Sequence, residues 1–293
     1  MSNVLGHEGI IKDLTAFAGR GELPHGYIFF GPAMTGKRAI AVALAHFLEK
    51  GTFATPQGGE VLQDMKVVDL EFAKQLDPDR KDSVSIDAVR EIKNFLWQKP
   101  NASKRRTLVL DEAEFLTTEA QNALLKLTEE PPASSLIIIV TADLDALLPT
   151  IVSRLQKIYF GAVPEKDIAK WLVAEHGVTA AKAAQFAKRA HGKPGLAWRL
   201  HADKTFQEQL ALAEQFLKTP AAGRGAFIKK ILEPEDFNLR IFLDALIVVL
   251  AWAMEKPTAG RIALWHRALA LYGRAMDFGL NPRLQLAALL AAD

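Results

Sequence analysis

The amino-terminal half of the sequence alternates between two hydrophobic patterns, and this alternation limits the fold more than any other feature. Short apolar runs predict strands buried on both faces of a sheet, at residues 27–30, 66–70, 107–110, 136–140 and 158–160. Between these runs, apolar residues recur at helical spacing, as in residues 40–48 and 86–96. Strands that alternate with helices predict a parallel sheet with right-handed crossovers and helices on both faces. The predicted fold class of this part is therefore α/β.

The rest of the chain has a different character. After about Gly161 no strand pattern follows, and Ala-rich and Leu-rich helical stretches are broken by glycine and proline. We expect an α/β domain over residues 1–161, a small helical domain over 162–203 and a separate all-α domain over 204–293. Of the 293 residues, 49% are hydrophobic, which is enough for such cores and excludes disorder for most of the chain.

Composition also excludes several classes of protein. The chain has no cysteine, which excludes disulfides, thiolate zinc sites, iron–sulfur clusters and a cysteine nucleophile, and agrees with a reducing compartment. The longest apolar stretches, 245–254 and 136–140, are shorter than the roughly 20 residues of a membrane span, and the first residues lack a signal sequence. We therefore expect a cytoplasmic protein without membrane contact. A net charge of +2 does not by itself indicate nucleic-acid binding.

A glycine-rich loop connects the first predicted strand to the next helix. It consists of Gly31, Pro32, Ala33, Met34, Thr35, Gly36, Lys37 and Arg38. In a P-loop at this place, backbone N–H groups face phosphate, the helix amino terminus adds positive potential and Lys37 contacts the outer phosphates. The alternative is a Gly-Pro turn into a helix, with Lys37 solvated.

The last position of this loop departs from the P-loop pattern. That position is normally Ser or Thr, whose hydroxyl ligates Mg²⁺, but here it is Arg38. A guanidinium cannot coordinate a cation, although it can contact phosphate directly. The loop therefore allows ATP or ADP to bind and disfavours Mg²⁺-dependent turnover. We assign no metal site to the chain.

Two acidic residues follow the third predicted strand. Asp111 and Glu112 come directly after Leu110, which is the Walker B arrangement of an apolar strand that ends in two acids. In that arrangement the first acid holds Mg²⁺ and the second orients the attacking water. The alternative is that both acids only favour the start of the next helix. We interpret the pair as a Walker B motif, vestigial if no Mg²⁺ binds.

Four segments together resemble the AAA+ clamp-loader family, and within it the delta-prime subunits of bacterial DNA polymerase III. They are residues 85–91, 111–116, 120–132 (AQNALLKLTEEPP) and 147–156 (LLPTIVSRLQ). The family patterns for the last two are AxNALLKxLEEPP and LLPTIxSRCQ. The resemblance implies an AAA+ P-loop domain, a helical lid and a helical collar for the three expected domains, and residues 281–284 resemble the start of the last collar helix.

The same resemblance implies roles for two further residues. Arg154 matches the arginine finger that a loader subunit lends to ATP bound by its neighbour, although Leu155 replaces the family's cysteine. A guanidinium supplied in trans neutralises charge on the transferring phosphoryl group. Thr141 matches the sensor 1 position. The alternatives are a surface salt bridge for Arg154 and an ordinary strand-end threonine for Thr141.

The chain departs from the family pattern at two further places. The family's zinc module has four cysteines, so it is absent or metal-free here, and we predict no zinc. Gly195 stands about where hydrolysing subunits have the sensor 2 arginine, and Arg199, one helical turn further on, is expected to face elsewhere. The chain keeps the finger that it would lend and lacks parts needed for its own turnover.

The resemblance also implies partners. These are delta-like and gamma/tau-like subunits, the sliding clamp, and primed DNA through the assembled complex. A basic cluster before the third strand either contacts DNA or is a solvated loop; it comprises Lys99, Lys104, Arg105 and Arg106. The aromatic residues Trp252, Trp265 and Tyr272 either pack within the last domain or contribute to the collar.

These observations favour one function over two others. We expect a delta-prime-like clamp-loader subunit that helps load the clamp, presents Arg154 to an adjacent motor subunit, and is a poor ATPase alone within the DNA polymerase III holoenzyme. The second hypothesis, an active gamma/tau-like ATPase, rests on Lys37, Asp111 and Glu112. A third, an AAA+ ATPase outside replication, is disfavoured by the match at 147–156.

Overall fold

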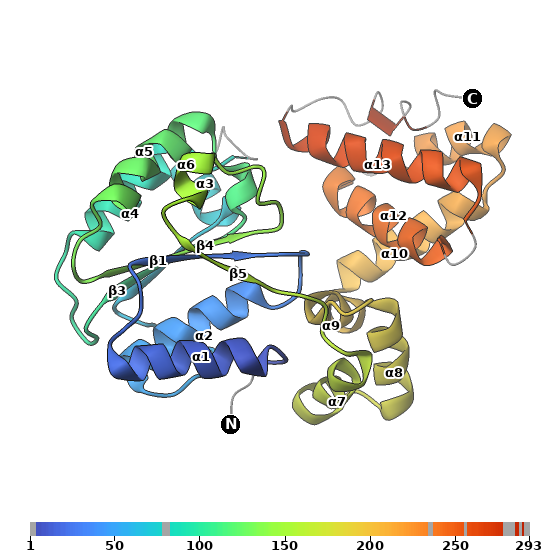
Figure 1. Ribbon diagram of the computed structural model, residues 1–293. Coiled ribbons are helices and arrows are strands. Elements are labelled where there is room, and N and C mark those ends of the chain that lie inside the picture. Colours follow the sequence, from blue (N-terminus) through green and yellow to red (C-terminus); the bar gives the residue numbers. More distant parts are fainter. Residues whose placement is uncertain are drawn as a thin grey trace. The chain divides into compact units, whose positions relative to one another are not determined.

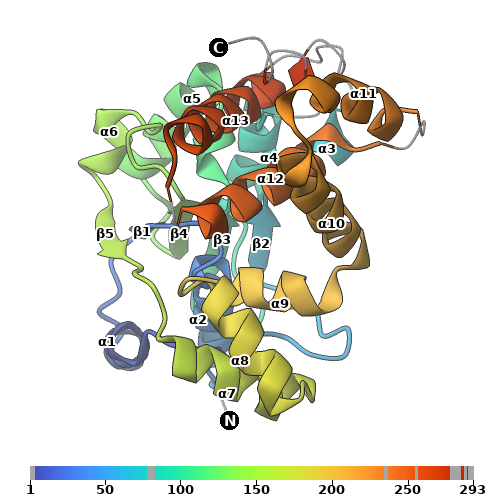
Figure 2. The same ribbon diagram turned by 90° about the vertical axis from the view of Figure 1, so that its right-hand side faces the viewer.

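The computed structural model describes residues 4–77, 83–233, 237–254, 257–277, 285, 286 and 289. The chain forms two compact units, residues 1–197 and 198–293 (Figures 1 and 2). The division of the first unit into an α/β domain and a lid stays a prediction. The expected collar-helix start at 281–284 lies outside the described residues.

A parallel sheet of five strands forms the centre of the first unit. The strands are β1 (Gly26–Phe30), β2 (Met65–Val68), β3 (Arg106–Leu110), β4 (Ser135–Thr141) and β5 (Gln156–Tyr159). Their order is β2-β3-β4-β1-β5, and every neighbouring pair is parallel. The predicted α/β fold class is confirmed.

Burial of the strands follows their position in the sheet. β3 and β4 are buried along their whole length, and β1 nearly so, as the apolar runs predict. The prediction that all five strands are buried on both faces is wrong for β5, in which Gln156, Lys157 and Tyr159 are exposed. β2 is also only partly buried. Both strands are edges of the sheet, where one side has no neighbouring strand.

Helices cover both faces of this sheet (Figure 1). One face carries α1 (Glu8–Arg20) and α2 (Lys37–Lys50), and the other carries α3 (Leu70–Leu76), α4 (Ile86–Leu96), α5 (Thr118–Glu129) and α6 (Pro149–Val152). A short 3-10 turn, η1 (Ala113–Phe115), follows β3. The core between α1, α2 and the sheet includes Leu14, Phe29, Ile40, Leu44 and Phe160, all nearly inaccessible to solvent.

Several strand boundaries differ from the prediction by one or two residues, and the difference at the end of β2 affects the site. The apolar run at 66–70 predicts a strand through Asp69 and Leu70, but β2 ends at Val68. The Asp69 carboxylate instead accepts a hydrogen bond from the Phe72 N–H, 2.9 Å away, and caps α3. An aspartate with an extended backbone favours a helix start over a further strand residue. This places Asp69 at the carboxyl edge of the sheet.

The remaining helices complete the two units. The first unit continues with α7 (Glu165–His176), α8 (Ala180–Arg189) and the start of α9 (Pro194–Ala202), and the second contains α10 (Lys204–Lys218), α11 (Ala221–Ile231), α12 (Leu239–Ala253) and α13 (Ala259–Asp277). α10 packs on α12 around Phe206, Phe216 and Phe242, which are fully buried. Trp252, Trp265 and Tyr272 are partly buried. None of the described helices is both long and apolar enough to cross a bilayer.

Candidate functional site

The glycine-rich loop lies between β1 and α2, and three of its residues have left-handed backbone conformations. Gly31 and Gly36 have φ values of +127° and +103°, and Met34 is also left-handed at +63°. A Cβ on Gly31 would lie 2.4 Å from the carbonyl oxygen of Phe160, the residue directly after β5, so there is room only for glycine. A Cβ on Gly36 would meet no atom within 4 Å, so space is open beside the start of α2.

Lys37 is folded back into this loop. Its side chain is buried, and Nζ donates hydrogen bonds of 2.7 Å to the carbonyl oxygens of Gly31 and Pro32. Burial lowers the pKa of Lys37 and the nearby Lys193 lowers it further, against the opposing charges of Glu114 and Asp111. The alternative of a solvated lysine is therefore wrong, because the ammonium group lies inside the loop.

Arg38 lies between two carboxylates at the carboxyl edge of the sheet. Its Nη1 is 2.8 Å from Oδ2 of Asp69 and 3.2 Å from Oδ2 of Asp111. Burial lowers the pKa of Arg38, but the charges and hydrogen bonds of Asp111 and Asp69 outweigh burial and raise it. Burial raises the pKa of Asp111, although Arg38 opposes this. The three residues form one ion cluster, which we call the Arg38 cluster.

The Arg38 cluster does not fit a magnesium ion. A carboxylate that binds Mg²⁺ must offer its oxygen to the metal, and Oδ2 of Asp111 already accepts a hydrogen bond from Arg38. The guanidinium brings its own positive charge to the place where the P-loop hydroxyl would ligate the ion. Sequence reasoning missed Asp69, and the signal that could have found it is its position directly after β2.

The other acidic residues after β3 serve the local backbone. Glu112 has a left-handed backbone with φ +52°, and its Oε2 accepts from the Leu70 N–H at 3.4 Å. Oε2 of Glu114 lies 2.9 Å from the Thr141 hydroxyl and 3.2 Å from the Ala142 nitrogen. Thr141 pairs in register with Phe30, so this network lies beside the start of the P-loop.

The predicted finger residue, Arg154, lies apart from the P-loop on the surface after α6. Its Nη2 donates to Oε1 of Glu129 and its Nη1 to the Thr150 carbonyl oxygen, both at 2.6 Å. About a third of the Arg154 side chain is exposed. Leu155, in place of the family's cysteine, is buried against β1, where a Cβ on Gly26 would lie 2.6 Å from it.

The start of α9 contacts the P-loop through backbone atoms. The Gly195 N–H donates to the Met34 carbonyl oxygen at 3.0 Å, and a Cβ on Gly195 would lie 3.0 Å from the Met34 Cβ. Arg199 faces elsewhere, as expected: it binds Asp244 at 2.7 Å and lies over the ring of Phe206. Gly195, which the resemblance places about where the sensor 2 arginine would fall, therefore lies close to the backbone of the glycine-rich loop.

Comparison with known proteins identifies the family. A family model described as DNA polymerase III, delta subunit matches residues 6–164, which is more than half of the chain. The chain belongs to this clamp-loader family. It is 31% identical over 143 residues to the DNA polymerase III subunit delta' of Pseudomonas aeruginosa, covering 46% of this chain and 43% of that protein.

The chain is also similar to gamma/tau subunits of DNA polymerase III. The chain is 32% identical over 172 residues to the gamma/tau subunit of Mycobacterium tuberculosis, covering 57% of this chain and 29% of that protein. It is 28% identical over 231 residues to the tau subunit of Salmonella typhimurium, covering 76% of this chain and 34% of that protein. The chain spans less than half the length of each of these relatives.

Solved structures agree with the fold. A DNA polymerase III gamma subunit-related protein of Thermotoga maritima has a TM-score of 0.56 and 19% identity, covering 96% of this chain and 97% of that one. The Thermotoga maritima RuvB branch migration motor has a TM-score of 0.51 and 18% identity, covering 95% of this chain and 83% of that one. Both show the AAA+ fold that the clamp-loader family shares.

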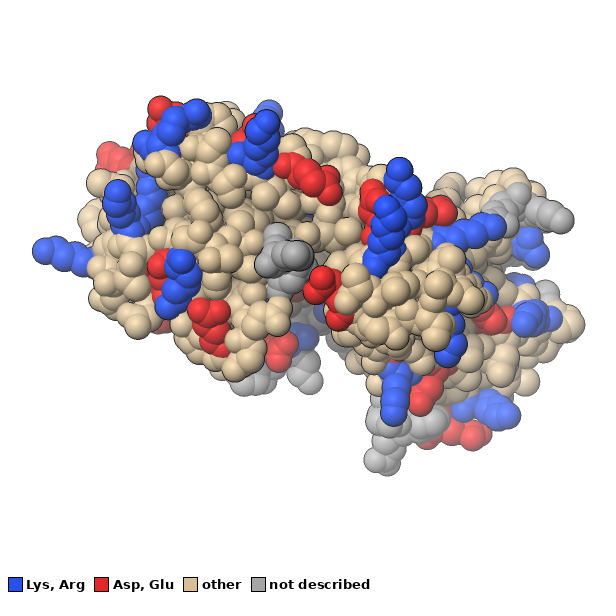
Figure 3. All heavy atoms as spheres, turned by 90° about the horizontal axis from the view of Figure 1, so that it is seen from below, with Lys and Arg blue, Asp and Glu red and all other residues tan. Residues whose placement is uncertain are grey.

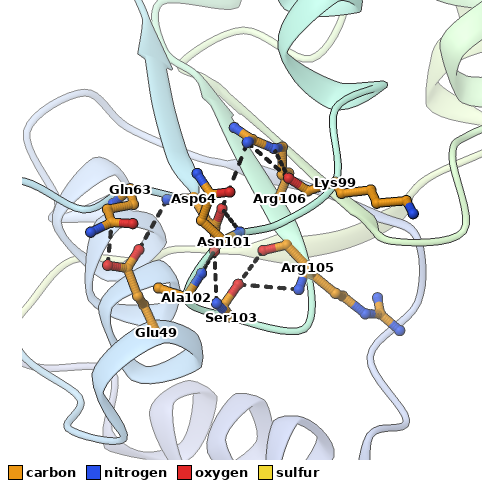
Figure 4. Close-up of polar contacts among 9 residues, drawn as sticks. All are labelled: Glu49, Gln63, Asp64, Lys99, Asn101, Ala102, Ser103, Arg105 and Arg106. Atoms are coloured by element: carbon orange, nitrogen blue, oxygen red, sulfur yellow. Dashed lines mark hydrogen bonds and ion pairs between the residues drawn. The ribbon is translucent and has the colours of Figure 1, made fainter.

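The basic cluster of this clamp-loader chain is only partly a surface feature (Figure 4). The Arg106 side chain is buried, donates twice to the Lys99 carbonyl oxygen and lies over the Phe95 ring. Arg105 donates to two backbone carbonyls near β1. Lys99 and Lys104 are exposed. Figure 3 shows Lys and Arg interspersed with Asp and Glu on the face drawn there.

The segment between α2 and β2, where the family's zinc module falls, is held by polar contacts. The Glu49 carboxylate accepts from the N–H groups of Gln63 and Asp64, at 3.2 and 3.0 Å. The two His46 ring nitrogens lie 2.6 Å from the Thr52 carbonyl oxygen and 3.1 Å from Glu60. Among the described residues, no group of His, Asp and Glu side chains is arranged to hold a metal ion.

Proposed function

We propose that this chain is a delta-prime-like subunit of a DNA polymerase III clamp loader. It helps load the sliding clamp onto primed DNA, lends Arg154 to ATP held by a neighbouring gamma/tau-like subunit, and is a poor ATPase itself. The observation that carries the proposal is the position of Arg38, whose Nη1 bridges Asp69 and Asp111 where a motor subunit needs Mg²⁺. Without the metal, the charge on the transferring phosphoryl group has no strong neutralising partner at this site.

The P-loop remains suited to nucleotide phosphates. Its glycine geometry, the open space at Gly36 and the ammonium group of Lys37 support binding of ATP or ADP. On binding, Lys37 would exchange its two carbonyl partners for phosphate oxygens. Asp111 and Glu112, in the Walker B position, then act as structural rather than catalytic residues, because Arg38 and the Leu70 backbone engage their carboxylates.

The position of Arg154 supports the proposal that this chain lends an arginine finger to a neighbouring subunit. Its guanidinium is partly exposed on the surface after α6 and is oriented by Glu129 and Thr150. An oriented, partly exposed guanidinium is suited to neutralise charge on phosphate oxygens of a neighbouring subunit. Thr141, in the sensor 1 position, is engaged by Glu114 and is assigned no catalytic role in this subunit.

The close approach of Gly195 to the P-loop is a third observation, and it supports the proposal that the chain is a poor ATPase. A sensor 2 arginine at this position would place its Cβ 3.0 Å from the Met34 Cβ and 3.3 Å from the Met34 carbonyl oxygen. Contacts at these distances are tighter than usual and require the neighbouring atoms to shift by a few tenths of an ångström. The partners that follow from this role are delta-like and gamma/tau-like subunits, the clamp, and DNA through the assembled complex.

Reconstitution of the loader tests this function. The chain is mixed with motor subunits, clamp and primed DNA, and ATP hydrolysis and clamp loading are measured for the wild type and Arg154→Ala. We expect a loss of at least about tenfold in hydrolysis, because an arginine finger stabilises charge in the transition state. Arg90→Ala is the matched control, since Arg90 is exposed and its ion pair within the described residues is with the exposed Asp87. Unchanged hydrolysis with Arg154→Ala contradicts the finger assignment.

A gamma/tau-like ATPase is the second candidate, favoured by the retained Lys37 and by the 32% identity to a gamma/tau subunit. It predicts Mg²⁺-dependent ATP hydrolysis by the isolated chain that Glu112→Gln abolishes. The delta-prime-like function predicts little hydrolysis by the isolated chain and no effect of Glu112→Gln on the assembled loader. Strong turnover by the chain alone would decide for the second candidate.

A further inference from the structure

Two cationic side chains lie at the P-loop, and the charge of a third acts on it. Lys37 lies inside it, Arg38 lies at its carboxyl end, and Lys193 is close enough for its charge to lower the pKa of Lys37. Within the described part of the chain, neither lysine forms an ion pair. Grouped cations repel one another unless an anion lies between them. The two lysine ammonium groups have no direct carboxylate contact in the described part of the chain, although the charges of Glu114 and Asp111 act on Lys37.

Arg38 has hydrogen-bonding capacity to spare. Only Nη1 donates to described residues, while Nη2 and Nε have no acceptor among them. About half of the side chain is exposed, whereas Asp69 and Asp111 are each 15% exposed. The carboxylates thus hold one edge of the planar guanidinium and leave the other donors available. A guanidinium offers two parallel N–H groups to a phosphate, which a lysine does not.

We propose that Arg38 takes the place of the divalent cation, so that this P-loop binds nucleoside di- or triphosphates without Mg²⁺. This deepens the proposed function and rests on nucleotide binding at the same loop. The Arg38 guanidinium is a cation already paired with the acid that would otherwise hold the metal, Asp111. It also lies next in sequence to Lys37, so both cations sit at the amino terminus of α2.

The arrangement also explains why added Mg²⁺ would not help binding. A metal ion between the phosphates and Asp111 would have to displace the guanidinium from Asp69 and Asp111. The displaced guanidinium would then lose two charge-assisted hydrogen bonds, and its charge would repel the metal. Nucleotide bound here is held by Lys37, Arg38 and the loop N–H groups, and it is not positioned for hydrolysis.

Equilibrium binding tests the proposal without measuring turnover. The full chain is titrated with fluorescently labelled ADP, and with unlabelled ATP in competition, in excess EDTA and in excess Mg²⁺. We expect dissociation constants that agree within about twofold, because no ligand position is left for the metal. Tightening by Mg²⁺ of about tenfold or more, or no binding in either condition, overturns the proposal.

The variant Arg38→Thr restores the hydroxyl of the P-loop pattern. In EDTA it should bind labelled ADP at least about tenfold more weakly than the wild type, because a charged hydrogen-bond donor is lost. Added Mg²⁺ should restore most of that loss. Arg90→Thr is the matched control, and circular dichroism checks that each variant is folded.

If the Arg38→Thr variant binds labelled ADP in EDTA as tightly as the wild type does, the proposal is also overturned. The wild-type comparison of EDTA with Mg²⁺ decides the question even if the variant does not fold. None of these measurements involves Arg154 or the other loader subunits. Failure of metal-independent binding therefore leaves the finger assignment standing, and failure of the finger assignment leaves this result interpretable.

Discussion

Arg154 and Glu129 are joined by a 2.6 Å ion pair that links the segment after α6 to the end of α5. Both side chains are substantially exposed, and a pair of this kind contributes about 0–1 kcal/mol to the free energy of unfolding. The pair therefore does little for the fold. It restricts the orientation of the Arg154 guanidinium, which the proposed role as an arginine finger requires.

Replacing Glu129 should separate these two effects. Glu129→Ala should change the free energy of unfolding by less than about 1 kcal/mol. In the reconstituted loader it should lower ATP hydrolysis by about three- to tenfold, less than Arg154→Ala, because the finger is present but poorly oriented. Glu119→Ala, on the same helix, is the control. Hydrolysis at the wild-type level, or an effect of Glu129→Ala that adds fully to that of Arg154→Ala, contradicts positioning by Glu129.

Gly195 should tolerate an added methyl group less well than another helical glycine. In Gly195→Ala the new Cβ meets the Met34 Cβ at 3.0 Å, so the contact between α9 and the P-loop must yield. We expect a loss of about 1–2 kcal/mol in urea unfolding. Gly19→Ala in α1 is the matched control, since no atom lies within 4 Å of that site, and helix propensity should stabilise it by about 0.5–1 kcal/mol. Equal effects at the two sites would refute the close approach.

The sheet was predictable from the sequence because buried parallel strands leave a local signal. Apolar runs located all five strands, although several strand ends differ by one or two residues. The burial of the two edge strands was also wrong, since a run of residues does not reveal whether a strand has a neighbour on each side. The P-loop and Arg154 were located by contiguous motifs. Their hydrogen-bond partners, including Glu129, depend on how α5 and α6 pack.

The Arg38 cluster was only half predictable. Asp69 and Asp111 lie 31 and 73 positions after Arg38 in the sequence. The parallel sheet brings the three residues together because each follows a strand whose carboxyl end lies on the same side of the sheet. The basic cluster illustrates the opposite error. Arg106 belongs to a run of cations in the sequence, yet its side chain is buried beside Asp64, which directly precedes the neighbouring strand β2. A pair between residues so far apart in the sequence leaves no local pattern from which it could be predicted.

The two glycines of the P-loop should differ in how much they matter for stability. Gly31→Ala places a Cβ 2.4 Å from the Phe160 carbonyl oxygen at a φ of +127°, so we expect a loss of about 3 kcal/mol or more. In Gly36→Ala the new Cβ meets no atom within 4 Å. The free energy of unfolding should therefore fall by only about 1–2 kcal/mol, because alanine is strained at a φ of +103°. The midpoint and slope of urea unfolding measure both. A larger loss for Gly36→Ala would contradict the close contact between Gly31 and the Phe160 carbonyl group.

Asp64 is the centre of a buried polar network that should make stability depend on pH. Its carboxylate accepts 2.7 Å hydrogen bonds from the N–H groups of Asn101, Ala102 and Ser103, and Arg106 lies 4.0 Å away (Figure 4). Burial alone would raise the pKa of Asp64, but these hydrogen bonds and the Arg106 charge outweigh burial and lower it. The ionised form is thus favoured in the folded state.

The sign of the effect follows from this direction. A carboxyl group whose pKa is lower in the folded state stabilises the fold above its unfolded pKa of about 3.9, and this contribution is lost as the pH falls through the folded pKa. Asp64→Asn should therefore lower the free energy of unfolding by about 2–4 kcal/mol at pH 7, because buried N–H donors lose a charged acceptor. The deficit should persist to about pH 5 and shrink below about pH 4.

Urea unfolding of wild type and Asp64→Asn between pH 3 and pH 7 measures this deficit, with Asp87→Asn as the control. Asp87 is exposed and pairs with the exposed Arg90, so its replacement should cost less than about 0.5 kcal/mol at every pH. A deficit for Asp64→Asn that is the same at pH 3 and pH 7 would mean that the amide loses shape or packing rather than charge. Stabilisation of the 99–106 segment by this network would then not depend on the ionisation of Asp64.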